Sequence, residues 1–141
     1  MSESVKFLHT AQTRTTGGRD YGASRSSDGV LDIRLSSPGS ARIGANPEQL
    51  FATAWSASLE STIALAARQR KVTLPVGPVI AAEVDLCLAD GANFLQARLN
   101  VSLPGVEWEV AHALVNEAHQ ACAYSNATRG NIDVVINLVQ P

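Results

Sequence analysis

Hydrophobic and polar residues alternate along several stretches of this chain, and alternation of period two is the pattern of a half-buried strand. It is clearest at residues 30–35, 79–88 and 94–103, each of which we predict to be a strand. A weaker alternation at 5–13, rich in strand-forming residues, predicts a first strand. The apolar run at 132–139 predicts a last one.

Turn residues between these stretches predict how they pair. Ser26-Ser-Asp-Gly separates residues 21–25 from the strand at 30–35, and Ala89-Asp-Gly-Ala-Asn separates the two strands that follow. Both arrangements are typical of hairpins. The second hairpin is expected to bury one face, formed by Val84, Leu86 and Leu88 from one strand and Leu95, Ala97, Leu99 and Val101 from the other. Gly, Ser and Pro at 16–20 and 36–45 predict loops.

A long helix is predicted to begin at Asn46 and to end near Gln69. Asn is a good N-cap, Pro47 suits the first helical position, and Gln49 completes a capping-box pattern. Residues 50–69 contain no Gly or Pro and are apolar on almost every side, which is typical of a buried helix. At about 1.5 Å per residue the helix would be roughly 30 Å long, as long as a small domain is wide.

A second helix is predicted at 107–122, followed by a turn at 125–130. Its apolar stripe is expected to be Val110, Ala113, Leu114, Ala118 and Ala121. Strands and helices are segregated along the chain and nothing repeats, so the fold class is α+β. The length of 141 residues fits one domain, 1–141.

Composition and charge exclude several classes of function. The net charge is −2 and the basic residues are scattered, so we expect neither a nucleic-acid nor a membrane partner. No signal sequence or membrane span is evident, which makes the cytoplasm the simplest location. Cys87 and Cys122 are expected to remain thiols there. His112 and His119 would lie about 10.5 Å apart on their helix, too far to share a metal ion.

Four residues are candidates for chemistry, and each also has a plain structural interpretation. Arg19 lies in a Gly-Gly-Arg turn and could be an exposed loop charge. Glu48 lies in the first turn of a helix, where an acid is favourable without any function. Ser58 could bond back to its own helix. Cys122 could be a small buried hydrophobic residue.

Four segments together favour the functional interpretation. Thr16-Gly-Gly-Arg-Asp, Asn46-Pro-Glu-Gln-Leu-Phe, Trp55-Ser-Ala-Ser-Leu and Ala121-Cys-Ala-Tyr-Ser-Asn-Ala-Thr-Arg-Gly-Asn resemble the organic hydroperoxide resistance proteins of the OsmC-like family. The likeness runs in order from about residue 7 to 139. The resemblance implies an OsmC-like fold, with antiparallel sheets packed around a long buried central helix, in an intertwined homodimer.

The resemblance also implies a thiol peroxidase that reduces alkyl and lipid hydroperoxides to alcohols. In this family a cysteine on the central helix attacks the peroxide and becomes a sulfenic acid; a second cysteine then condenses with it, and a dithiol of the lipoyl type, such as a lipoylated protein, reduces the disulfide. No bound cofactor is implied. The attacking position falls on Ser58, the resolving cysteine is Cys122, and Arg19 and Glu48 would flank the thiolate.

The apolar neighbours of Ser58 would suit a greasy hydroperoxide, and the substrate pocket is expected to include Phe51, Trp55, Leu59 and Ile63. Glu48 lies ten residues before Ser58 on the same predicted helix, about 15 Å along its axis. A glutamate side chain cannot span that distance. Either the helix breaks between them or Glu48 comes from a partner subunit, and we expect a two-fold homodimer with sites at the interface.

Serine lacks the nucleophilicity of a thiolate and cannot form the disulfide, so loss of peroxidase turnover is expected. Two histories fit. One is an engineered Cys-to-Ser substitution, slightly favoured because Arg19, Glu48 and Cys122 are all present. The other is a natural paralogue that binds fatty-acid-like apolar ligands. A serine hydrolase is disfavoured because the Gly-x-Ser-x-Gly elbow is missing. Ala123 replaces the family's usual proline, and Cys87 is given no role.

Overall fold

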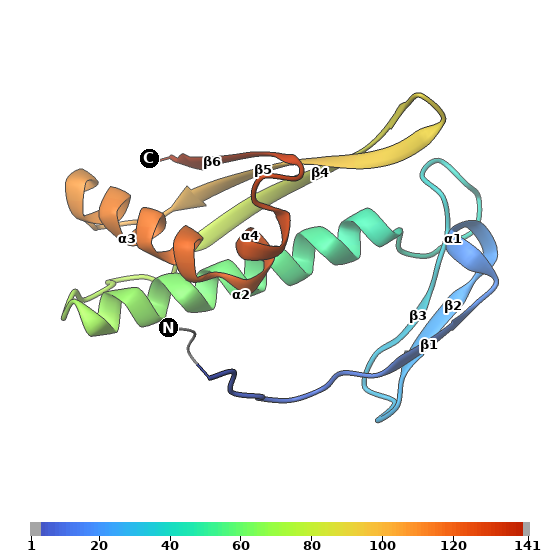
Figure 1. The fold of residues 1–141 in the computed structure, drawn as a ribbon, viewed down its shortest axis with the longest axis horizontal. Coiled ribbons are helices and arrows are strands. Elements are labelled where there is room, and N and C mark those ends of the chain that lie inside the picture. The colour runs from blue at the N-terminus through green and yellow to red at the C-terminus, as the bar shows by residue number, and fades with distance from the viewer. Residues whose placement is uncertain (1–3, 140–141) are drawn as a thin grey trace. The chain divides into compact units, whose positions relative to one another are not determined.

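The structure, a computed structural model, describes residues 4–139 and divides into two compact units that meet in the sequence between Pro47 and Glu48. Figure 1 shows the first unit in blue and cyan and the second in green to red. The second unit holds the long helix, the larger sheet and both cysteines, so it carries most of the candidate site.

The first unit is an antiparallel sheet in the order β1-β2-β3, with β1 at Thr13–Thr16, β2 at Ala23–Ser26 and β3 at Asp32–Arg34. The hairpin expected after residue 20 is therefore confirmed. The strand predicted at residues 5–13 lies too near the N-terminus, because β1 begins only at Thr13 and residues 5–12 form no strand.

The Gly-Gly-Arg segment is a short helix rather than a simple turn: α1 spans Gly18–Tyr21. Gly17 precedes it in the left-handed conformation with φ of 80°, which glycine adopts without strain. Gly22 follows it so closely that an added Cβ would lie 2.2 Å from the carbonyl oxygen of Gly18. These two glycines set the path of the chain around Arg19.

The second unit contains a mixed sheet in the order β4-β5-β6. Strand β4 at Val79–Ala89 pairs antiparallel with β5 at Ala92–Ser102, as the alternation and the turn predicted. Strand β6 at Asp133–Leu138 pairs parallel with β5, so the expectation of purely antiparallel sheets was wrong. The chain between β5 and β6 crosses over through two helices, which is how parallel neighbours are joined.

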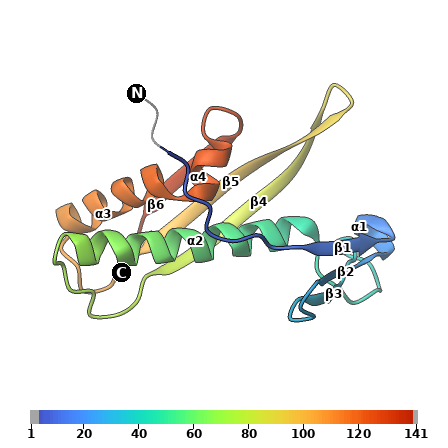
Figure 2. The ribbon, with the colours of Figure 1, turned by 60° about the horizontal axis from the view of Figure 1, so that its bottom comes forward.

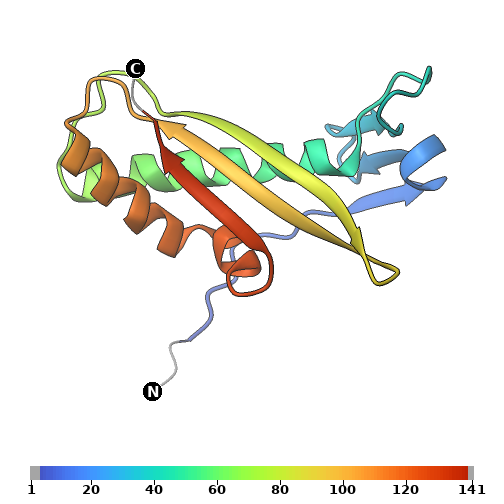
Figure 3. The ribbon, with the colours of Figure 1, turned by 90° about the horizontal axis from the view of Figure 1, so that it is seen from above.

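The long helix α2 spans Pro47–Gln69, matching the prediction, and α3 spans Trp108–Ala121. The side chain of Glu107 caps α3 by accepting a hydrogen bond from the Val110 amide at 3.2 Å. A further helix, α4 at Ala123–Thr128, replaces most of the predicted turn. Figures 1 and 3 show α2 and α3 side by side beneath one face of the sheet, with α4 at the end of α3.

The core of the second unit lies between that sheet face and the two helices. Its buried side chains come from α2, β5 and α3, and they include Trp55, Leu59, Ile63, Ala66, Ala97, Leu99, Val101, Leu114, Val115 and Ala118. On α2 they form a single stripe. The expectation that α2 is buried on almost every side is wrong for the described chain, since Leu65 is 44% exposed.

Two details of the predicted apolar faces were wrong. Leu86 and Leu88 are 46% and 71% exposed because the hairpin runs on past the core toward its turn, at the end far from α3 (Figures 1 and 3). On α3, Ala121 is exposed, whereas Ala111 and Val115 are buried. The stripe on α3 is therefore rotated from the one predicted.

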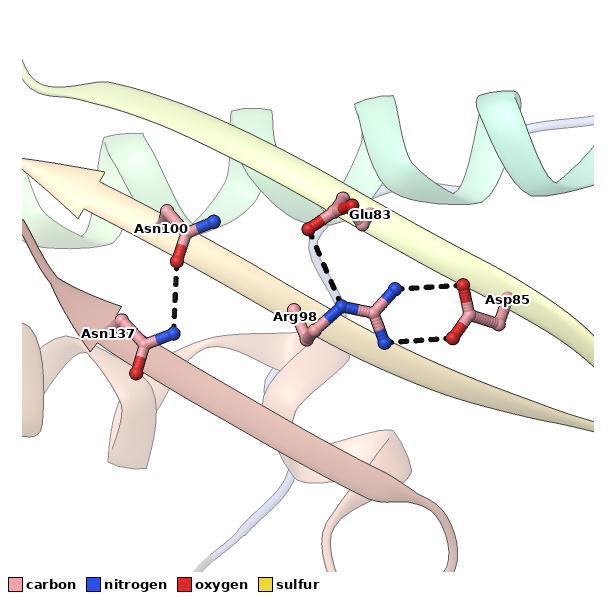
Figure 4. Close-up of polar contacts among 5 residues, drawn as sticks. All are labelled: Glu83, Asp85, Arg98, Asn100 and Asn137. Carbon is pink, nitrogen blue, oxygen red and sulfur yellow. Dashed lines mark hydrogen bonds and ion pairs between the residues drawn. The ribbon is translucent and has the colours of Figure 1, made fainter.

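The opposite face of the sheet carries polar pairs that involve all three strands (Figure 4). Arg98 of β5 donates two hydrogen bonds of 2.8 Å to the carboxylate of Asp85 and lies 3.4 Å from Glu83. Hydrogen bonding to Arg98 lowers the pKa of Asp85. Asn137 of β6 bonds to Asn100 at 3.0 Å. These pairs tie the strands together on the face away from the helices.

Candidate active site

Ser58 and Cys122 lie in contact in the second unit, although 64 positions separate them in sequence. The thiol of Cys122 donates to the hydroxyl oxygen of Ser58, with 3.6 Å between Sγ and Oγ. Cys122 is fully buried and Ser58 is half-buried. The helical back-bond considered for Ser58 is made by its neighbour Ser56, whose hydroxyl donates to the carbonyl of Ala52 at 2.7 Å. The Ser58 hydroxyl faces the thiol.

Cys122 is the joint between α3 and α4. Its backbone is extended, with φ of −70° and ψ of 130°, so it ends one helix and precedes the other. Its N–H donates to Ala118 at 2.8 Å and its carbonyl accepts from Asn126 at 2.9 Å. Both backbone groups are therefore held by the flanking helices, and the side chain turns inward between them to meet α2.

Aromatic residues of α2 and α4 belong to the core cluster that contains Cys122. Indole Nε1 of Trp55 donates to the hydroxyl of Ser125 at 3.2 Å, and both side chains are fully buried. Phe51, one turn earlier on α2, lies 5.6 Å from the Trp55 ring and 6.2 Å from the ring of Tyr124, measured between centroids. Edge and tilted contacts of this kind are favourable for aromatic pairs. The cluster around Cys122 is therefore largely apolar, with the Ser125 hydroxyl as the partner of the indole N–H.

The four predicted pocket residues divide into two groups. Phe51 is half-buried beside Tyr124, so part of its surface remains accessible. Trp55, Leu59 and Ile63 are fully buried in the core of the second unit. Tyr124 and Ser125 were not singled out from the sequence, although both lie in the segment that carried the resemblance. Hydrophobic periodicity does not reveal them, because the sequence predicts a turn at residues 125–130.

Glu48 and Ser58 lie on one unbroken helix, α2. The alternative in which the helix breaks between them is thereby removed. Ten residues at about 1.5 Å each still separate them by roughly 15 Å along the axis. Arg19 lies on α1 of the first unit. Its part in the site, like that of Glu48, stays a prediction.

His119, one turn before Cys122, occupies an unusual environment. Its Nδ1 atom is buried and has no hydrogen-bond partner among residues 4–139. Burial, with a smaller effect from the Arg129 guanidinium, lowers the pKa of His119. Arg129 in turn donates to the His119 carbonyl and to the Asn126 side chain, both at 2.6 Å. Through these two hydrogen bonds the Arg129 side chain links the end of α3 to α4.

The comparison with protein families identifies the chain. The model of the family described as OsmC-like protein matches residues 37–137. The chain belongs to this OsmC-like family. A named relative, the organic hydroperoxide resistance protein of Xanthomonas axonopodis pv. citri (strain 306), is 40% identical over 98% of this chain and 99% of its own. The protein OhrA of Bacillus subtilis (strain 168) is 39% identical over 94% and 97%.

Solved structures of OsmC-like proteins share this fold. The organic hydroperoxide resistance protein OhrB of Bacillus subtilis superposes with a TM-score of 0.87 at 36% identity, covering 94% of this chain and all of the other. A Vibrio cholerae protein described as a putative organic hydroperoxide resistance protein, with captopril bound in one of its active sites, gives a TM-score of 0.89 at 33% identity over 96% and 95%. The predicted α+β OsmC-like fold is confirmed.

The described part of the chain offers neither a metal site nor a membrane-spanning helix. No group of three or more His, Cys, Asp or Glu side chains is arranged to hold a metal ion. No helix within 4–139 is long and apolar enough to cross a membrane. Cys87 and Cys122 are both free thiols, and Cys87 lies on β4 opposite Phe94, in a different element from the site.

Proposed function

We propose that this OsmC-like chain has the scaffold of a thiol-dependent organic hydroperoxide reductase, with serine at the position of the attacking cysteine. The observation that carries the proposal is the contact between Ser58 and Cys122 at 3.6 Å. An S–S bond of about 2.05 Å would require the two side-chain atoms to approach by about 1.5 Å. Serine at position 58 makes that bond impossible.

With cysteine at position 58, the reaction would run in two balanced steps. The thiolate attacks one oxygen of R–O–O–H, the O–O bond breaks, and the alkoxide leaves and takes up a proton to become the alcohol ROH. The sulfur is then a sulfenic acid. The Cys122 thiol attacks that sulfur, a disulfide forms, and water leaves. An external dithiol, which we propose to be of the lipoyl type, reduces the disulfide back to two thiols.

Arg19 and Glu48 have proposed roles in the first step. A nearby guanidinium lowers the pKa of a cysteine and raises the fraction of thiolate. A carboxylate can fix the plane of that guanidinium through paired hydrogen bonds. Since the α2 helix is unbroken between Glu48 and Ser58, we propose that Glu48 reaches the site of the partner in a two-fold homodimer.

The exposure of the first unit also supports a dimer. Among the described residues of the first unit, Leu35 is the one hydrophobic side chain that is buried. Four large side chains of this unit are each at least 75% exposed: Phe7, Tyr21, Val30 and Ile43. So small a core rarely stabilises a unit alone.

Sedimentation should give a dimer, and Glu48→Gln should lower the rate of hydroperoxide reduction by a Ser58→Cys protein. A fully active monomer would refute the shared site.

The experiment that tests the function is restoration of the thiol. The parent protein and Ser58→Cys are assayed for reduction of an alkyl hydroperoxide with dihydrolipoamide as reductant. We expect no turnover above background from the parent and rapid turnover from the variant, because a hydroxyl is a poor nucleophile toward peroxide oxygen. Ser56→Cys, one half-turn away on α2, is the matched control and should remain inactive.

Inactivity of Ser58→Cys, together with co-purified fatty acid detected by mass spectrometry, would instead favour a non-catalytic module that binds apolar ligands. Equal activity of parent and variant would refute the assignment of position 58.

The proposed setting is the cytoplasm, a reducing compartment in which the thiols of Cys87 and Cys122 persist.

A further inference from the structure

Two contacts, one part-buried and one fully buried, join α2 to the joint between α3 and α4, and they are related by position. Ser58 meets Cys122, and Trp55 meets Ser125. On α2 the two residues are three positions apart, and so are the two at the joint. Residues three apart on a helix are neighbours on its surface. The two contacts therefore lie side by side and run in opposite directions along the two segments.

A pair of contacts fixes more than one contact can. The Ser58–Cys122 contact fixes one point of the joint against α2, and the Phe51–Tyr124 ring contact adds a non-directional one. The indole N–H of Trp55 donates to the Ser125 hydroxyl at 3.2 Å, and this directional bond fixes α4 at a further point. Both of its partners have no exposed surface, so water cannot replace either group if the bond is broken. A buried donor or acceptor left without a partner is costly, which keeps this bond closed.

We propose that the Trp55–Ser125 hydrogen bond is a positioning device for the thiol pair, holding Cys122 within bonding reach of position 58. Ser125 is a positioning residue here, because it acts through the orientation of Cys122 and does not itself meet the reacting atoms. The inference rests on the proposed function in that position 58 is taken as the partner of Cys122. It adds that the resolving step depends on a hydrogen bond outside the reacting groups.

The plain alternative is that Ser125 satisfies the indole N–H of a core tryptophan and does nothing more. The two interpretations differ in one measurable quantity, the effective concentration of one thiol toward the other in the folded protein. That quantity is obtained by equilibrating Ser58→Cys protein with reduced and oxidised glutathione and measuring the disulfide fraction by mass spectrometry. It involves no hydroperoxide, so it can be read whether or not the variant proves to be a peroxidase.

In the Ser58→Cys background, Ser125→Ala should lower the effective concentration roughly fivefold to tenfold, the size expected for one lost hydrogen bond. Trp55→Phe should lower it by a similar factor. The Trp55→Phe/Ser125→Ala double variant should lose no more than the larger single loss, because both changes remove the same interaction.

Thr128→Val is the matched control. Thr128 is also buried on α4, but its hydroxyl bonds to the carbonyls of Tyr124 and Ser125 within that helix and not to α2. It should leave the effective concentration within twofold of the Ser58→Cys parent, whatever it does to the unfolding midpoint. Urea unfolding of the reduced proteins confirms that each variant is folded.

Two results would overturn the proposal. One is an effective concentration unchanged within twofold by Ser125→Ala in a folded protein. The other is an equal fall in Thr128→Val, which would mean that loosening α4 by any route has the same effect. If Ser125→Ala does not fold, Trp55→Phe and the double variant carry the same test. Failure of Ser58→Cys to reduce hydroperoxide, with the glutathione result intact, would remove the peroxidase function and keep the positioning.

Discussion

Cys122 lies at the joint between α3 and α4 and Ser58 lies on α2, yet the thiol of Cys122 donates to the hydroxyl of Ser58 across 3.6 Å. In the Ser58→Cys protein, Cys122→Ser should therefore stop the reaction after its first step. We expect a stable sulfenic acid, visible as a mass increase of one oxygen or as a dimedone adduct, and loss of multiple turnover with a dithiol.

The matched control is Cys87→Ser. Cys87 lies on β4 in register with Phe94, away from the Ser58–Cys122 contact, so turnover should be unchanged. Retained turnover in the Cys122→Ser variant would show that the external dithiol attacks the sulfenic acid directly and would remove the resolving role of Cys122.

Ala123 is the first residue of α4, and the backbone of Cys122 before it is extended with ψ of 130°. Proline suits both conditions, since the first helical N–H has no acceptor within the helix and the residue before proline prefers extended backbone. Ala123→Pro should raise the free energy of unfolding by about 0.4–1 kcal/mol through reduced freedom of the unfolded chain. Denaturant unfolding measures the change.

The contrasting substitution is Ala127→Pro, in the body of the same helix. It should destabilise the protein by about 3 kcal/mol or more, since proline there removes a helical hydrogen bond and clashes with the preceding turn. Destabilisation by Ala123→Pro would mean that the joint needs a backbone angle or an N–H that proline cannot provide.

Leu99 is fully buried on the central strand β5, whereas Leu88 is 71% exposed near the end of β4. Leu99→Ala should lower the free energy of unfolding by about 2–5 kcal/mol, from lost burial and a residual cavity. Leu88→Ala should change it by less than about 0.5 kcal/mol. Chemical denaturation of both variants checks the difference, and equal losses would place the core elsewhere.

The pKa of His119 is lowered from its ordinary value of 6.5 by burial and by Arg129. Above that value the histidine is neutral in both the folded and the unfolded chain. As the pH falls below about 6.5, the unfolded chain takes up a proton more readily, so the free energy of unfolding decreases. His119→Gln should make the decrease between about pH 7 and 5.5 shallower.

Unfolding at several pH values measures this dependence. His112→Gln, on the exposed face of the same helix, is the control for loss of an imidazole. If His119→Gln has the same pH profile as the parent, the lowered pKa of His119 contributes nothing to acid sensitivity, and the slope comes from carboxylates.

Local signals predicted the elements whose ends are encoded by neighbouring residues. Asn46 and Pro47 mark the start of α2, and alternation with a Gly-containing turn marks the β4–β5 hairpin. The helix α4 was missed because Ser125 and Asn126 are typical turn residues. What makes them helical is the extended backbone of Cys122, whose carbonyl begins a new helix by accepting from Asn126. Tertiary packing sets that backbone conformation.

The site was predictable only in part for the same reason. The resemblance pointed to Ser58 and Cys122, but no spacing rule brings together residues 64 positions apart. The contact depends on how α2 packs against α3 and α4. Ser125 was beyond local reasoning because its role depends on a tryptophan 70 positions earlier. The apolar stripe on α3 is rotated from the predicted one, with Ala111 buried in place of Ala121. That rotation is likewise set by the surface of the core against which α3 packs.

The parallel pairing of β5 with β6 has a consequence for the order of folding. Strand β5 ends at Ser102 and β6 begins at Asp133, with two helices between them. We therefore expect β5 to pair with β4 first and with β6 later, after the intervening chain has folded. Until then a strand carrying Ala97, Leu99 and Val101 presents an open edge and an incompletely covered apolar face. Such edges recruit strands from other molecules. Aggregation during refolding should therefore compete most strongly with the docking of β6.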